Sequence, residues 1–100
     1  TDRVDILYTV SYLQFELSNF NESLTNLDIL INNDLTNEMS VSVSKSDDTR
    51  QDILMRSQLH YLKGLIYSEQ DNNELAKISF EKSLEISPEF ENAADKLKLL

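Results

Sequence analysis

The clearest evidence for the fold lies in residues 55–88, which read MRSQLHYLKGLIYSEQDNNELAKISFEKSLEISP. Apolar residues recur first at helical steps of three and four, at Met55, Leu59, Leu62 and Ile66. A polar tract at 70–73 then interrupts the pattern. The same kind of spacing resumes at Leu75, Ala76, Phe80 and Leu84, and Pro88 ends it. The stretch therefore predicts two antiparallel helices joined by a polar turn.

The flanking sequence predicts three more helices and one loop. Residues 3–18 repeat the helical pattern, which the tract 18–21 breaks. A second helix then runs to about Asn33 and completes a first hairpin. After Pro88, the apolar residues of 89–100 predict a short final helix. The segment 36–48 is rich in Ser, Thr, Asn and Asp and predicts a loop.

The composition agrees with a single all-α domain over residues 1–100. One glycine and one proline are too few for the turns of a β-sandwich or barrel. Sixteen leucines against four valines favour helices in the same way. We therefore expect an all-α fold in one domain.

The charge of the chain is strongly acidic and uneven. Residues 1–49 carry nine acids against two bases, and residues 50–100 carry nine acids against seven, which gives a net charge of −9. A field of this sign repels phosphate backbones and anionic lipids, so we predict neither nucleic acid nor membrane as a partner. Basic or amphipathic protein segments fit better. No apolar run approaches the roughly 18 residues of a membrane span.

The hairpin of residues 55–88 also resembles a known repeat. Five residues follow the spacing G-x2-Y-x8-A-x3-F-x7-P, at Gly64, Tyr67, Ala76, Phe80 and Pro88. This pattern is similar to the tetratricopeptide repeat (TPR), a unit of about 34 residues. Gly64 and Ala76 are small where two helices must approach closely, and Phe80 fills the space between them. The resemblance implies stacked helical hairpins, part of an α-solenoid.

The first hairpin fits the same template more loosely. The equivalent positions hold Ser11, Gln14, Ser23, Leu27 and Leu35. Small residues stay small and large residues stay apolar, except at Gln14 and Leu35. We therefore expect repeat 1 at about 4–35, an insertion loop at about 36–48, repeat 2 at about 50–88 and a capping helix at about 89–100.

No residue pattern predicts catalysis, a metal or a cofactor. His60 is the only histidine, and the sequence identifies no nucleophile or orienting partner for it, so we interpret it as a helix-packing residue. The acids follow no metal-loop spacing, and a single glycine cannot form a phosphate-binding loop. Cysteine is absent from the chain. We predict that the protein is not an enzyme.

The segment 36–48 allows more than one interpretation. We favour a tolerated surface loop, because each doubling of loop length costs only about 0.6 kcal/mol. Deleting residues 38–47 should then leave stability nearly unchanged. Phosphorylation of the serines at 40–46 would extend the negative charge for a basic partner. The alternation of Val and Ser could also form a short edge strand.

The resemblance implies a protein-interaction module, an adaptor or scaffold subunit, with a concave groove on the first helix of each repeat. The groove positions correspond here to Asp5, Tyr8, Tyr12, Phe15, Glu16, Gln58, Tyr61, Leu65, Ser68 and Glu69. None of them is basic. The alternative is a co-chaperone that holds the acidic tail of Hsp70 or Hsp90. It is disfavoured, because capturing a carboxylate needs fixed cations.

The first helix carries two apolar faces. We expect the second helix to bury one of them, which consists of Ile6, Val10, Leu13 and Leu17. The other face belongs to the predicted partner-binding surface, which comprises Tyr8, Tyr12, Phe15, Glu16, Tyr61, Leu65 and Glu69. This aromatic floor with acids beside it suits a basic or amphipathic segment of another protein.

Two further questions stay open at this stage. Self-association or further repeats could also cover the aromatic face of the first helix. The expected location is the cytoplasm, with the nucleus or the cytosolic face of an organelle as alternatives.

Overall fold

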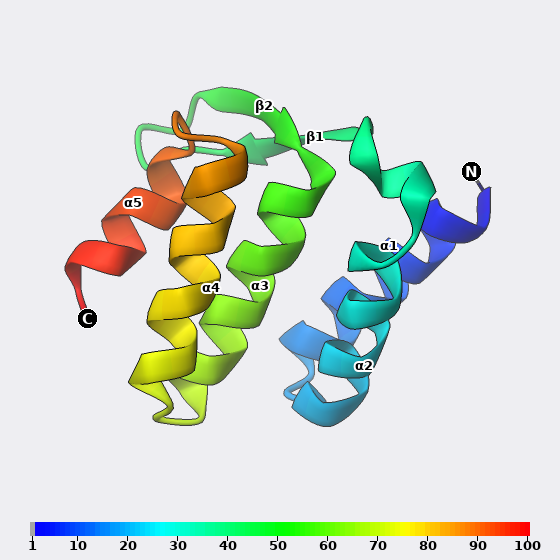
Figure 1. Cartoon of the computed structure of the whole chain (residues 1–100), viewed down its shortest axis with the longest axis horizontal. Helices are drawn as coiled ribbons and strands as arrows, with labels where there is room; N and C mark the ends of the chain where they lie inside the picture. Colours follow the sequence, from blue (N-terminus) through cyan, green and yellow to red (C-terminus); the bar gives the residue numbers. More distant parts are fainter. Residues whose placement is uncertain (1) are drawn as a thin grey trace.

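The computed structural model describes residues 2–100 and shows two helical hairpins followed by a short helix (Figure 1). The elements in chain order are α1 (Asp2–Glu16), α2 (Phe20–Ile31), the 3₁₀ helix η1 (Asp34–Asn37), β1 (Ser40–Ser44), β2 (Arg50–Leu54), α3 (Met55–Glu69), α4 (Asn73–Ile86) and α5 (Glu91–Lys98). α1 packs on α2, α3 on α4, and α5 on α4. The fold is the expected all-α, TPR-like arrangement, with one small β-hairpin added.

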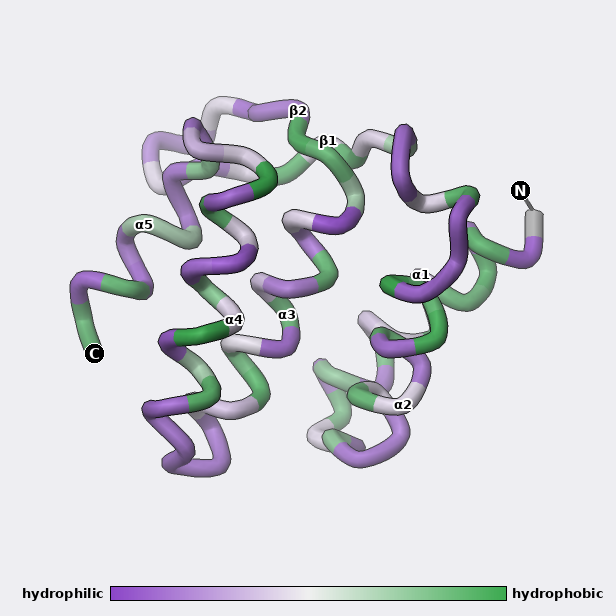
Figure 2. The backbone as a smooth tube through the Cα atoms, in the orientation of Figure 1, coloured by the Kyte–Doolittle hydropathy of each residue, from purple (hydrophilic) through white to green (hydrophobic). Residues whose placement is uncertain are grey.

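The second hairpin is held together by a close approach of α3 and α4. A Cβ atom placed on Gly64 would lie 2.5 Å from Cε1 of Phe80, so only glycine leaves room for this ring. Phe80 is buried, and the Ser83 hydroxyl donates to the Ser57 carbonyl over 2.8 Å. The connection between the two helices is polar, and Figure 2 shows it as the hydrophilic tip of the hairpin. The predicted roles of Gly64 and Phe80 are confirmed.

The first hairpin uses serine at its close approach. Ser11 and Ser23 are both fully buried, and the Ser23 hydroxyl donates to the Ser11 carbonyl over 2.8 Å. One turn further along, the Asn26 amide donates to Gln14 Oε1 over 2.8 Å. Gln14, which departs from the repeat pattern, is thus paired with a polar residue of α2.

One core cluster joins the two hairpins. Its buried members come from α1, α2 and α3, and they are Val4, Leu27, Leu30, Met55, Leu59, Leu62 and Ile66. On the surface beside this core, Lys63 of α3 forms an ion pair with Asp28 of α2, with 2.7 Å between Nζ and Oδ1. These contacts hold the two hairpins together.

The prediction for the inward face of α1 is wrong. Ile6, Val10, Leu13 and Leu17 are 64%, 37%, 51% and 72% exposed, whereas Val4 and Ser11 are buried. The reason is the close approach at Ser11, because the buried side of α1 must include this small residue. At 100° per residue, the aliphatic face lies well around the helix from Ser11 and points to solvent.

The prediction of a loop at 36–48 is also wrong. After η1, β1 pairs with β2 in antiparallel register, with Ser40 opposite Leu54 and Ser44 opposite Arg50. Alternation along β1 places Val41 and Val43 on one face of the hairpin. Val43 and Ile53 form a second core cluster with Phe90 and Ala93, and this burial outweighs the polar composition of the segment. α3 consequently begins at Met55, five residues later than the predicted start of repeat 2 at residue 50.

Polar contacts attach the β-hairpin to α5 and to the residues before it. The Gln51 side chain donates to the Glu89 carbonyl over 2.6 Å, and the Asn92 amide donates to the Ser44 carbonyl over 2.9 Å. Lys45 and Glu91 form an ion pair of 2.9 Å. The hairpin is therefore a packed part of the domain.

Candidate functional site

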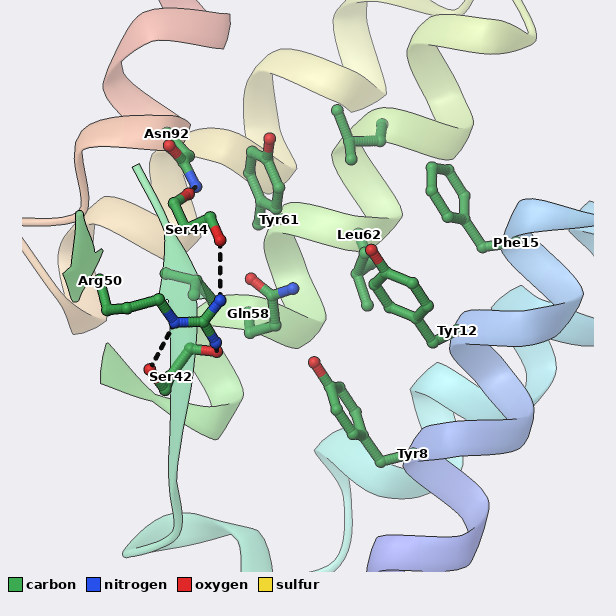
Figure 3. A pocket seen from close by; sticks show the side chains of 12 residues that line it. Tyr8, Tyr12, Phe15, Ser42, Ser44, Arg50, Gln58, Tyr61, Leu62 and Asn92 are labelled. Atoms are coloured by element: carbon green, nitrogen blue, oxygen red, sulfur yellow. Dashed lines mark hydrogen bonds between the residues drawn. The ribbon is translucent and has the colours of Figure 1, made fainter. Parts of the chain in front are cut away.

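A cleft of about 470 Å³ lies between α1 and the β-hairpin, with α3 between them as its floor (Figure 3). α1 contributes three aromatic side chains, Tyr8, Tyr12 and Phe15. α3 contributes Gln58, Tyr61, Leu62 and Leu65. The opposite wall consists of Ser42, Val43, Ser44, Arg50 and, from α5, Asn92. The cleft thus joins residues of α1, the β-hairpin, α3 and α5.

Five of the seven residues predicted for partner binding line this cleft. They are Tyr8, Tyr12, Phe15, Tyr61 and Leu65. The other two, Glu16 and Glu69, are exposed residues at the ends of α1 and α3 and lie outside the lining. Asp5 lines a separate hollow with Ile6, Thr9 and Val10. The expected acidic rim is therefore not part of the cleft wall.

The aromatic side chains of α1 form a continuous row. The ring centroids of Tyr8 and Tyr12 lie 6.5 Å apart, and those of Tyr12 and Phe15 lie 6.2 Å apart. Steps of four and three place these rings on one face of the helix. Tyr12 is 38% exposed, while Tyr8 and Phe15 are half-buried. Tyr12 is therefore the member of the row most open to a partner.

Tyr61 belongs to the cleft and to the core at the same time. Its ring centroid lies 5.8 Å from that of Phe80 and 5.1 Å from that of Phe90. Burial raises the pKa of its hydroxyl, and Tyr12 and Asp95 act in the same direction. Removing this ring would disturb the packing of α3, α4 and α5. A Tyr61 variant therefore cannot separate binding from folding.

Gln58 supplies an unpaired acceptor at the floor of the cleft. The residue is only 5% exposed, and its Oε1 atom is buried without a hydrogen-bond partner. Burial raises the pKa of the neighbouring Tyr8 hydroxyl, an effect that a hydrogen bond with Gln58 opposes. A buried acceptor without a partner costs about 1–3 kcal/mol.

Arg50 is the one charged residue of the lining, and it is not among the residues predicted for partner binding. Its Nε donates to the Ser42 hydroxyl over 3.1 Å, Nη1 to the Ser44 hydroxyl over 2.7 Å, and Nη2 to the Ser42 carbonyl over 2.9 Å (Figure 3). These contacts exist only because β1 and β2 pair. The alternation of valine and serine in residues 40–44 was the signal that could have revealed them.

The fold and cleft agree with the comparison to known families. Residues 57–90 match the family model of the tetratricopeptide repeat. This match confirms the resemblance seen in the sequence, and the second hairpin is a tetratricopeptide repeat. The match does not include the first hairpin, whose assignment as a further repeat stays a prediction. No curated protein and no solved structure matches the chain.

Two features are absent from residues 2–100. In this part of the chain, none of the helices combines the length and the apolar character that a membrane crossing requires. The same residues contain no group of three or more His, Asp or Glu side chains placed to hold a metal ion.

Proposed function

We propose that this protein is an adaptor or scaffold subunit that binds a segment of a partner protein in the cleft between α1 and the β-hairpin. Tetratricopeptide repeats are typically non-catalytic interaction modules, and the match at 57–90 supports this class of function. The observation that carries the proposal is the row of Tyr8, Tyr12 and Phe15, which lines an open cleft together with Leu65.

The size and lining of the cleft support recognition by a few anchor side chains. A volume of about 470 Å³ falls within the range of roughly 300–1,000 Å³ typical of ligand sites. Tyrosine is enriched among the residues that dominate binding energy, because its ring is large and rigid and carries a polar tip. An apolar or aromatic anchor of the partner would fill the space beside Tyr12.

The net charge of the chain favours a partner segment that carries Lys or Arg outside the part that enters the cleft. The net charge of −9 attracts such a segment over a distance and raises the rate of association. Neither α1 nor α3 contributes a cation to the cleft lining, and Arg50 of β2 is its one cation. This supports an adaptor over the co-chaperone alternative, which needs a cluster of cations on these helices.

A binding measurement on matched variants tests the proposal. Linear peptides that bind the full chain are selected from a random display library, and the Kd of a selected peptide is measured by titration. A binding hot spot of about 2 kcal/mol corresponds to a roughly thirtyfold loss of affinity, which we expect for Tyr12→Ala. Leu13→Ala is the control, because Leu13 is 51% exposed and lies outside the cleft lining.

Circular dichroism should show that both variants keep the helicity of the parent. Unchanged affinity in a folded Tyr12→Ala variant would place the recognition surface elsewhere. An equal loss in Leu13→Ala would do the same.

A further inference from the structure

The Arg50 guanidinium lies on the wall of the cleft and is held by neutral acceptors alone. Two serine hydroxyls and one carbonyl accept its three hydrogen bonds. Within residues 2–100 the ion pairs are Lys45–Glu91 and Lys63–Asp28, and neither involves Arg50. A guanidinium has five N–H donors, so donors remain for a ligand. The two serines hold the group in one place, which lowers the entropy cost of binding an anion to it.

A second polar group lines the same cleft. Gln58 is 5% exposed, and its Oε1 has no partner among the described residues. Figure 3 shows its side chain between Arg50 and the tyrosine row of α1. The cleft therefore presents a positive donor group beside an aromatic surface, with a buried, unpaired acceptor in its floor. An acidic side chain of an extended segment can satisfy the donor.

We infer that the cleft recognises an acidic side chain, Asp or Glu, of the partner segment. This side chain lies next to the apolar anchor of the segment and binds Arg50. This deepens the proposed function and rests on it. Arginine and carboxylate form charge-assisted, often bidentate hydrogen bonds, which fix the position of the segment as well as adding affinity. The remainder of the segment is neutral or basic, because the net charge of −9 repels a strongly acidic one.

The chemistry of the site favours a carboxylate over a phosphate. Phosphate groups are recognised by clusters of arginine or by an arginine with further cations, and Arg50 is the one cation of this lining. A single planar guanidinium matches the two oxygens of one carboxylate. The inference therefore requires no modification of the partner.

The test is a double-mutant cycle between the selected peptide and the full chain. The peptide is compared with a version in which its acid is replaced by the matching amide, Asp by Asn or Glu by Gln. Against the parent protein we expect this change to weaken binding by roughly tenfold or more. Against Arg50→Gln the same change should cost less than about twofold, because the partner of the carboxylate is gone.

Two further protein variants provide the controls. Lys77→Gln removes the same charge from an exposed position on α4. With this variant, the acid-to-amide change in the peptide should weaken binding as much as it does with the parent. Arg50→Lys keeps the charge but loses the planar fork, so its affinity for the acidic peptide should lie between those of the parent and Arg50→Gln. Helicity from circular dichroism accompanies each affinity.

The outcomes separate this inference from the proposed function. If the acid-to-amide change costs the same with Arg50→Gln as with the parent, or if the selected peptides contain no acid, the inference is overturned. The proposed function still stands in that case when Tyr12→Ala weakens binding. If the peptide is insensitive to Tyr12→Ala as well, or no peptide is selected, both fail. If amidating only the C-terminus of the peptide weakened binding, Arg50 would bind the terminal carboxylate and not a side chain. That result would also overturn the inference.

Discussion

At the scale of single residues, the contact between Gly64 and Phe80 sets the spacing of α3 and α4. A Cβ atom at Gly64 would lie 2.5–2.9 Å from three atoms of the Phe80 ring. We expect Gly64→Val to cost roughly 1–3 kcal/mol of unfolding free energy by overpacking. Phe80→Ala should cost roughly 3–5 kcal/mol through the cavity it leaves. Thermal melts measure both, and melting temperatures within a degree of the parent would contradict this packing.

His60 makes the stability of the protein depend on pH. Burial lowers its pKa to about 4, from an ordinary 6.5, and the cations Lys63, Lys82 and Arg56 act in the same direction against Asp28. Between these two pH values the unfolded chain binds more protons at this residue than the folded chain does. The stability that neutral His60 contributes to the folded chain is therefore fully present above about pH 6.5. It is lost as the pH falls towards 4.

The test of this dependence is urea unfolding of the parent and His60→Gln at several pH values from 7 to 4. We expect the free energy of unfolding to fall more steeply with acidification in the parent than in the variant. Parallel curves for the two proteins would show that His60 does not titrate in this way.

Individual residues also show how far the sequence could predict the site. The aromatic row of α1 and Leu65 of α3 followed from helical spacing and from the repeat pattern. Arg50 could not follow from either, because its place in the cleft depends on the pairing of β1 with β2. Glu16 and Glu69 were assigned from repeat positions, but their places at the ends of α1 and α3 leave them outside the lining.

At the scale of elements, the β-hairpin packs against α5 and the residue before it. Ile53 is 3% exposed and packs with Val43, Phe90 and Ala93. We expect Ile53→Ala to cost roughly 2–5 kcal/mol, because a buried aliphatic side chain is removed from a packed cluster. Ser46→Ala in the exposed turn is the matched control and should be neutral. Urea unfolding measures both variants.

The same contacts correct the expectation that residues 38–47 can be deleted without effect. Such a deletion removes β1 and exposes Phe90, so it should lower the melting temperature clearly. If Ile53→Ala or the deletion left stability unchanged, the hairpin would not be packed on α5.

Helix α1 shows why the pattern of one element does not determine its orientation. The spacing of its apolar residues predicts two apolar faces. The sequence of the helix alone does not show which of them is buried. The information lies in a neighbouring element, because Ser23 of α2 requires a small partner, which Ser11 provides. The repeat template contained this answer. The template position of Ser11 is a better guide to the buried side than the number of apolar residues on a face.

At the scale of the whole molecule, the β-hairpin lies across one end of the helices, beside the start of α5 (Figure 1). What remains open is the cleft on α3, bounded by α1 and by the hairpin. The outer face of α5 is polar, with exposed Asp95, Lys96 and Lys98. Four of the eight aromatic side chains, Tyr8, Tyr12, Phe15 and Tyr61, line this cleft.

Binding of the partner segment in the cleft can be tested by titrating a ¹⁵N-labelled chain with a selected peptide and mapping the changes in amide chemical shift. We predict that the largest changes follow the cleft, at Tyr8, Tyr12, Gln58, Leu65 and the strands β1 and β2. The exposed aliphatic face of α1 and the outer surface of α4 should change little. The claim that the cleft binds the partner would be contradicted if the cleft residues showed no shift changes and the largest changes lay at Ile6 and Leu13 or on α4.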